Sequence, residues 1–82
     1  MTALFLEIVT PEKIIFSQNV ISVNLPGEMG RFTILKQHAP LIASLKAGEI
    51  RVLGQFSDEF VFDCKSGIVE CLDNKVKVLV ES

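Results

Sequence analysis

Short apolar segments separated by turn residues constrain the fold of this chain more than any other feature of its sequence. Apolar and polar residues alternate in residues 20–25 and again in residues 75–80, as expected for strands that bury one face. Turn residues recur roughly every 5–12 positions, and no segment keeps helical spacing over about 11 residues. The sequence therefore predicts an all-β domain, an antiparallel β-sandwich of about ten short strands in two sheets.

The same alternation predicts the core and the turns. The polar residues 17–19 are expected to turn the chain, and Asp73-Asn74 to close a tight hairpin. Residues 41–45 fit either a strand or a short helical turn. The side chains expected to point inward from the clearest strands are Leu4, Leu6, Ile8, Ile21, Val23, Leu25, Val76, Val78 and Val80.

Residues 25–41 hold the most distinctive sequence, a strand between two turns. Pro26 fixes its own φ, and Gly27 is expected to take the positive φ of a type II turn. Pro40 ends the strand, because proline cannot donate to a ladder. The residues expected on a projecting loop are Glu28, Met29, Gly30 and Arg31. At a loop tip the charge of Arg31 would contribute little to stability.

Length and composition place the chain among small binding domains. Its 82 residues are expected to form one domain, residues 1–82, with a small core. The chain is 49% hydrophobic, the upper end for a soluble domain, so part of its apolar surface is expected to meet a partner. A net charge of −2 and the lack of Trp and Tyr argue against nucleic acid. The apolar runs are too short to span a membrane, and no signal peptide is visible.

Residues with catalytic or metal-binding chemistry are sparse. His38 is the single histidine, and the sequence places no nucleophile or carboxylate pair beside it. Gly27 and Gly30 do not form a phosphate loop, since no Lys-Ser/Thr pair follows them. Cys64 and Cys71 could face each other in a hairpin, but we interpret them as reduced, buried thiols. We predict no enzymatic activity, no cofactor and no metal site.

Several motifs follow one another along nearly the whole chain. They are Ile8-Val9-Thr10-Pro11-Glu12-Lys13, Leu25-Pro26-Gly27-x-x-Gly30-x-Phe32-x-Ile34-Leu35, His38-Ala39-Pro40-Leu41, Gly48-x-Ile50-Arg51-Val52, Gly67-Ile68-x-Glu70 and Asn74-x-Val76-x-Val78-Leu79. Each motif alone is weak. In this order and spacing, they resemble the N-terminal β-sandwich domain of the epsilon subunit of F-type ATP synthases.

The resemblance implies a non-catalytic rotor subunit at the foot of the central stalk of a proton-translocating ATP synthase. Such subunits clasp the gamma subunit, rest on the membrane-embedded c-ring and carry torque between proton flow and ATP synthesis. They associate with the membrane through the complex, here expected at the cytoplasmic face of a bacterial plasma membrane. By the resemblance, the c-ring-contact loop is Glu28, Met29, Gly30 and Arg31, and the gamma-contact face contains Thr10, His38 and Ala43.

Three departures from the family pattern change what the resemblance implies. Arg31 stands where family members often carry an acidic residue, which would invert the charge pairing with the c-ring. Lys36-Gln37 precede His38 in place of a Pro-Gly pair. The sequence ends at Ser82, whereas family members usually continue into a regulatory helical hairpin. The role of that hairpin is therefore not transferred to this chain.

Two other classes of function stay open on the residues alone. A biotinyl or lipoyl carrier sandwich needs an exposed lysine at a hairpin tip, and Lys65 is the candidate, without the acidic or Met neighbours usual at such sites. The other class is a stand-alone β-sandwich module that binds a different protein. An enzyme ranks below both, for want of an acid, base or metal constellation.

Overall fold

Eight β-strands and their connections make up the part of the chain that the computed structural model describes, residues 3–81. The strands are β1 (Leu4–Val9), β2 (Ile14–Gly27), β3 (Gly30–Leu35), β4 (Leu41–Leu45), β5 (Gly48–Gly54), β6 (Glu59–Cys64), β7 (Ser66–Leu72) and β8 (Lys75–Glu81). The all-β prediction is confirmed, and residues 41–45 are a strand. β2 is longer than predicted because the polar residues 17–19 do not turn the chain. They continue β2 and pair with β1.

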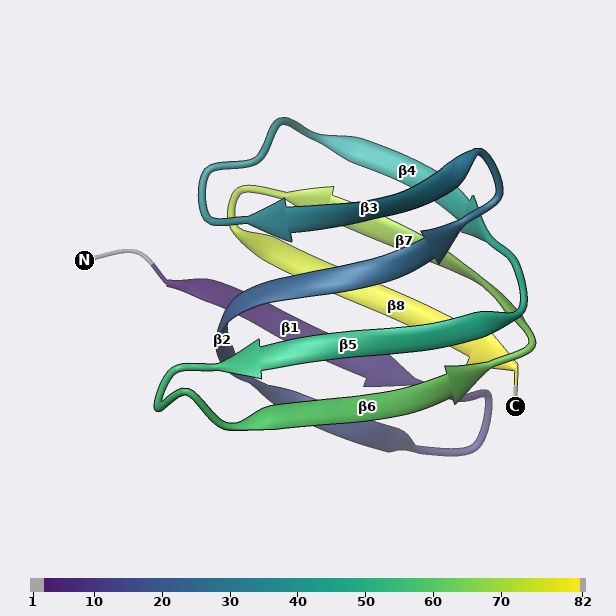
Figure 1. Cartoon of the computed structure of the whole chain (residues 1–82), viewed down its shortest axis with the longest axis horizontal. Helices are drawn as coiled ribbons and strands as arrows, with labels where there is room; N and C mark the ends of the chain where they lie inside the picture. The colour runs from purple at the N-terminus through teal and green to yellow at the C-terminus, as the bar shows by residue number, and fades with distance from the viewer. Residues whose placement is uncertain (1–2, 82) are drawn as a thin grey trace.

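β2 is the longest strand and belongs to both layers of the sandwich. Its first half pairs with β1, and its second half pairs with β3 on one edge and β5 on the other. One layer therefore has the order β3-β2-β5-β6, and the other has the order β2-β1-β8-β7-β4. Figure 1 shows β2 bending from one layer into the other. The predicted two-sheet sandwich is thus held together by a shared strand.

A β-bulge marks the point where β2 changes layers. The pairing register between β2 and β5 shifts between Val20 and Ser22, so that Ile21 falls out of the alternation. Val20 and Val23 are buried, whereas the side chain of Ile21 is 45% exposed. The expectation that Ile21 points inward is therefore wrong. One extra residue in a strand moves a side chain to the opposite face.

β1 and β8 form a parallel pair in a sandwich whose other pairings are antiparallel across the described strands. Phe5 lies opposite Lys75, and Val9 lies opposite Leu79. The strand pattern in the sequence predicts an antiparallel sandwich, and nothing in it indicates this parallel pair. It joins the beginning and the end of the described chain, so no short turn could have indicated it.

The core fills the space between the two layers. The other eight side chains predicted to point inward are all buried. Phe16 of β2 packs edge-to-face against Phe60 and Phe62 of β6, at ring-centroid distances of 5.1 and 5.5 Å. These aromatic contacts join the layers on the side opposite β3 and β4.

The predicted hairpin at Asp73-Asn74 is confirmed. Both residues take positive φ, 51° and 63°, as a two-residue type I′ turn requires. The main-chain carbonyl of Asn74 accepts the Phe5 N–H at 2.8 Å, and its side-chain Oδ1 accepts the Gln37 N–H at 2.5 Å. The hairpin therefore ties β1 and the β3–β4 connection to the same end of the sandwich.

We predict that Val78→Asp prevents folding, because Val78 is fully buried in β8 and the new carboxylate would have no partner. The cost of several kcal/mol is comparable with the roughly 5–15 kcal/mol that stabilises a typical domain. Far-ultraviolet circular dichroism would report the loss of strand signal. The control is Leu79→Asp, because the neighbouring Leu79 is 47% exposed and faces the other side of the sheet. Equal loss of structure in both variants would contradict the assigned core.

Candidate partner-binding surface

The β2–β3 hairpin projects from one end of the sandwich and has Glu28 and Met29 at its tip. Gly27 pairs with Gly30 across the hairpin, and Met29 is fully exposed. Positive φ occurs at Gly30, at 132°, and not at Gly27, so the predicted type II turn is wrong. Gly27 is required for space instead: a Cβ there would lie 2.7 Å from the Gly30 carbonyl oxygen and from the Phe32 ring.

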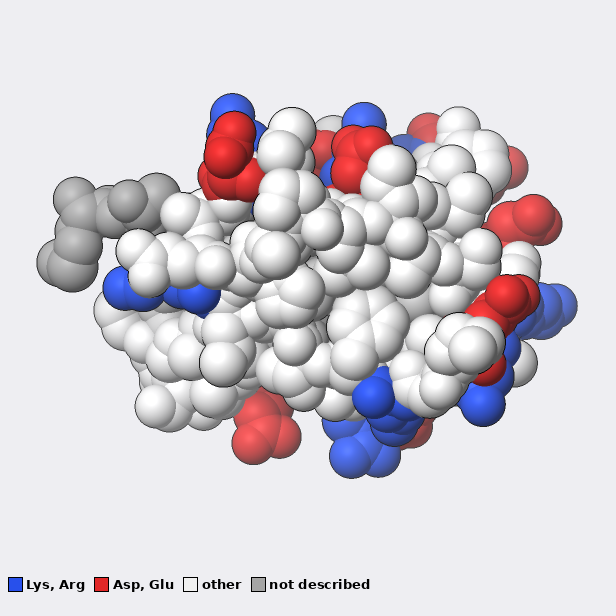
Figure 2. All heavy atoms as spheres, turned by 90° about the horizontal axis from the view of Figure 1, so that it is seen from above, with Lys and Arg blue, Asp and Glu red and all other residues white. Residues whose placement is uncertain are grey.

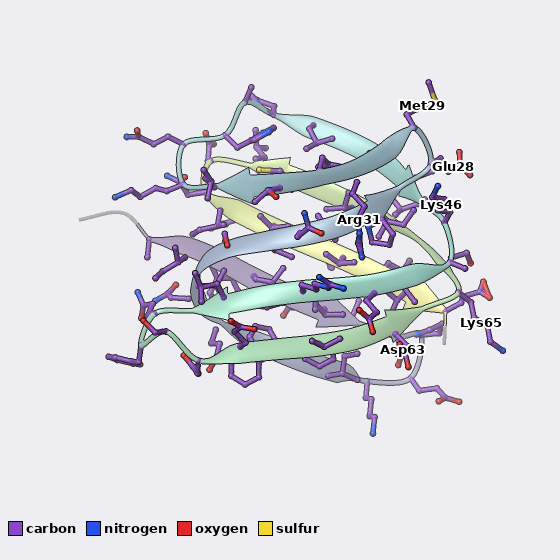
Figure 3. The ribbon with its side chains drawn as sticks, in the orientation of Figure 1. Glu28, Met29, Arg31, Lys46, Asp63 and Lys65 are labelled. Carbon is purple, nitrogen blue, oxygen red and sulfur yellow. The ribbon has the colours of Figure 1, made fainter. Side chains whose placement is uncertain are left out.

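Two main-chain hydrogen bonds fix the β2 arm and tip of this hairpin to the end of β4 and to the β4–β5 connection. The Glu28 N–H donates to the Ser44 carbonyl at 3.0 Å, and the Lys46 N–H donates to the Pro26 carbonyl at 2.8 Å. Figure 3 shows Glu28, Met29 and Lys46 at the same end of the molecule. The tip is therefore exposed but anchored through its backbone.

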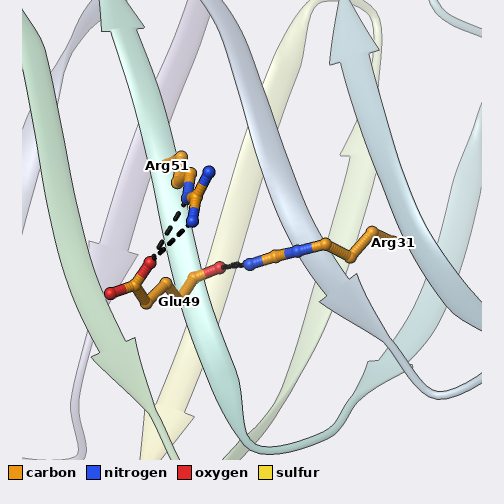
Figure 4. Close-up of polar contacts among 3 residues, drawn as sticks. All are labelled: Arg31, Glu49 and Arg51. Atoms are coloured by element: carbon orange, nitrogen blue, oxygen red, sulfur yellow. Dashed lines mark hydrogen bonds and ion pairs between the residues drawn. The ribbon is translucent and has the colours of Figure 1, made fainter.

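The prediction that Arg31 lies on the loop is wrong. Arg31 lies in β3, opposite Pro26. Its guanidinium points back over the sheet and donates Nη1–H and Nη2–H to the main-chain carbonyl of Glu49, with Nη1 at 2.8 Å (Figure 4). The carboxylate of Glu49 in turn accepts from Arg51 Nη2 at 3.0 Å. The positive charge of Arg31 is thus held on the outer face of the β3-β2-β5-β6 layer, away from the hairpin tip.

A hollow of about 460 Å³ separates β3 from β4, each the last strand of its layer. The two strands do not pair with each other in the described structure, so the hollow reaches partly buried core side chains. Its lining residues are Gly27, Glu28, Met29, Gly30, Phe32, His38, Leu41, Ile42, Ala43 and Ser44. Most of the lining is apolar or uncharged.

Five of the seven predicted site residues meet at this hollow. Glu28, Met29 and Gly30 line it from the hairpin, and His38 and Ala43 line it from the β3–β4 connection and β4. Figure 2 views the molecule from the β3–β4 side, where uncharged side chains occupy the centre and charged ones gather around the rim. A predominantly uncharged centre with a charged rim is the usual composition of a protein-binding surface.

Thr10 lies apart from this hollow, in the turn between β1 and β2. Its hydroxyl accepts the N–H groups of Glu12 at 3.3 Å and Lys13 at 3.2 Å. It borders a different hollow, together with Lys13 and Asp63 among others. The structure therefore brings His38 and Ala43 to one surface but does not bring Thr10 to it.

His38 lies on the exposed connection between β3 and β4. It is exposed, and its Nδ1 lies 2.7 Å from the carbonyl of Ala39. Across residues 3–81, no group of three or more His, Cys, Asp or Glu residues could hold a metal ion. None of residues 3–81 forms a helix that could span a membrane.

Cys64 and Cys71 are buried, free thiols. Cys64 ends β6, whereas Cys71 lies in β7 and pairs with Leu41 and Val76. β6 and β7 belong to different layers, so the hairpin that would set the two cysteines opposite each other does not form. Burial raises the pKa of both thiols above the ordinary value of 9.0.

Comparison with known proteins gives a consistent set of matches. The family model for the ATP synthase delta/epsilon chain β-sandwich domain matches residues 3–82. The ATP synthase epsilon chain of Chlorobium limicola is 45% identical over 76 residues, covering 93% of this chain and 86% of that one. The epsilon chain of Chlorobaculum tepidum is 43% identical over 79 residues, covering 96% and 90%. The chain spans a smaller part, 56%, of the epsilon chain of Desulfatibacillum aliphaticivorans, at 40% identity.

Two solved structures share the fold at low sequence identity. A chain of the Euglena gracilis mitochondrial ATP synthase (OSCP/F1/c-ring, rotational state 1) superposes with a TM-score of 0.91 at 16% identity, covering 98% of this chain and 51% of that one. A chain of the Tetrahymena thermophila mitochondrial ATP synthase central stalk and c-ring gives a TM-score of 0.82 at 16% identity, covering 99% and 65%. At this identity the likeness shows the fold alone.

We predict that iodoacetamide modifies Cys64 and Cys71 slowly in the native protein near neutral pH and rapidly in urea. The reactive species is the thiolate, which burial disfavours and also shields. Because the pKa values are raised in the folded state, these thiols stabilise the fold below about pH 9 and that contribution is lost as pH rises further. Mass spectrometry of timed samples would measure the rates. Equal rates with and without urea would contradict the burial of these thiols.

Proposed function

The chain belongs to the ATP synthase delta/epsilon β-sandwich domain family, and on that premise we propose that it is a non-catalytic rotor subunit of a proton-translocating F-type ATP synthase. In this role it binds the gamma subunit and the c-ring and helps couple proton flow to ATP synthesis. The observation that carries the proposal is the hollow between β3 and β4, beside a hairpin anchored through its backbone.

The shape of the surface supports two neighbouring contacts. Gamma covers the uncharged hollow around His38 and Ala43, where partly buried core side chains are accessible to a partner. The hairpin tip at Glu28 and Met29 faces the polar loops of the c-ring, because it projects and is anchored through the backbone of its β2 arm. Contact between gamma and Thr10 stays a prediction, since Thr10 borders a separate hollow.

The proposed location follows from the proposed partners. The chain sits at the cytoplasmic face of an energy-transducing membrane, held there by the c-ring and gamma. It contributes shape and stiffness to the rotor and needs no cofactor for this. An anchored hairpin suits such a role, because backbone hydrogen bonds to β4 and to the β4–β5 connection resist bending of the tip under load.

We predict that Ile42→Asp weakens binding to gamma by at least tenfold, because Ile42 is 72% exposed and lines the hollow. An unpaired carboxylate at an apolar contact costs on the order of 1.4 kcal/mol or more, which corresponds to a tenfold change. The measurement is titration of purified gamma with the wild-type chain and the variant.

Val61→Asp is the matched control for this experiment. Val61 is 56% exposed on β6, a strand that does not border the hollow, so its variant should bind gamma as the wild type does. Equal weakening by both variants would move the gamma surface elsewhere. A wild-type chain that binds neither gamma nor the c-ring would overturn the proposed function.

A further inference from the structure

The ladder between β2 and β5 stops where proline enters β2. Val23 lies opposite Val52 and Asn24 opposite Arg51, and the same register continued would place Pro26 opposite Glu49. The Pro26 carbonyl accepts the Lys46 N–H, so residue 26 turns its main-chain groups toward the β4–β5 side. Proline has no N–H, and β2 therefore offers no donor to the carbonyl of Glu49.

The guanidinium of Arg31 occupies the place of this missing donor. Arg31 lies opposite Pro26 on the far side of β2, and its side chain reaches back to the Glu49 carbonyl. Both terminal nitrogens donate to that oxygen, and Nη1 does so at 2.8 Å. Hydrogen bonds from a charged donor are stronger than those between neutral groups. One side chain thus links β3 to β5 across β2 at the base of the hairpin.

We propose that Arg31 is a positioning residue of the hairpin, which replaces the absent Pro26 N–H and leaves the carboxylate of Glu28 as the charge that the tip presents to its partner. The proposal rests on the proposed function, in which that partner is the c-ring. The surface then fits a polar loop with a cationic side chain, and Arg31 does not contact it. An arginine in place of an acidic residue at position 31 therefore does not invert the charge pairing between the hairpin tip and the c-ring.

The charges near the hairpin tip determine which charge the contacting side chain of the partner carries. Glu28 stands at the tip itself beside the uncharged Met29 (Figure 3), whereas the Arg31 side chain is directed to the Glu49 carbonyl (Figure 4). Lys46 lies on the neighbouring connection at the same end of the molecule, and its N–H donates to the Pro26 carbonyl. A cationic group opposite Glu28 satisfies charge complementarity at the point that projects furthest.

A double-mutant cycle on the chain alone tests the positioning role. Arg31→Met keeps an unbranched stem but loses the donors, so we expect it to raise the unfolding equilibrium constant by about tenfold in the wild-type background. In the Pro26→Ala background residue 26 regains an N–H, and the same substitution should raise the constant by less than about threefold. Urea unfolding measures all four variants. Equal effects in the two backgrounds would overturn the proposal.

A second comparison keeps the test decisive if Pro26→Ala fails to fold. Arg31→Lys retains a donor that can reach the Glu49 carbonyl, so it should keep more stability than Arg31→Met, although both lose the guanidinium plane. If Lys and Met at this position are equally destabilising, the bond to Glu49 does not hold the hairpin base and the proposal is wrong.

Binding to a purified c-ring in detergent, with gamma present, tests the charge of the tip. Glu28→Gln should weaken binding at least fivefold at low salt, with a smaller difference at high salt. Lys46→Gln is the matched control, which removes one charge at the same end and should not weaken binding. If Lys46→Gln weakens binding and Glu28→Gln does not, the tip meets an anionic loop and the proposal fails. If the wild type does not bind the c-ring at all, the proposed function fails instead, while the stability cycle still reports on Arg31.

Discussion

One strand shared by two layers determines the rest of this structure. The first half of β2 pairs with β1, and the second half pairs with β3 and β5. The two layers are therefore joined through the backbone as well as through the core. The change of layer occurs at the bulge, where Ile21 leaves the inward alternation. The arrangement leaves β3 and β4 as the terminal strands of their layers, lying beside each other without pairing. An open strand edge of this kind invites a partner unless something covers it.

The hairpin next to that open edge is stiff because its β2 arm is hydrogen-bonded to β4 and the β4–β5 connection, and its β3 arm to β5 through Arg31. β4 meets β2 at the pair Gly27 and Leu45, and the main-chain bonds on either side of this pair reach Ser44 of β4 and Lys46 of the connection. Pro26 keeps its carbonyl in this network but contributes no donor. The Glu49 carbonyl, which a residue with an N–H at position 26 would bind, therefore needs another donor, and the long side chain of Arg31 provides it.

Local sequence patterns predicted the core of this fold but not its connections across the sheet. Period-two alternation placed the valines of β8 and the leucines of β1 correctly, because one face of each strand is buried along its whole length. It failed at Ile21, where a bulge adds one residue, and at residues 17–19, whose polar side chains stay exposed in a strand that β1 holds by its ladder. The parallel pair of β1 and β8 joins distant parts of the chain, which no local pattern records.

Local sequence patterns also predicted only part of the candidate site, and they failed for the charge of Arg31. Turn residues placed Glu28 and Met29 on a projecting hairpin, since turn chemistry is local. The Arg31 side chain is directed toward the main-chain carbonyl of Glu49, 18 residues further along the chain. That carbonyl has no donor from β2 because Pro26 stands opposite it in the continued register. The sequence shows that residue 31 is an arginine but does not show in which direction its guanidinium points. For this surface the direction matters more than the residue type, because a guanidinium bound to Glu49 adds to the stability of the hairpin and not to the charge at its tip.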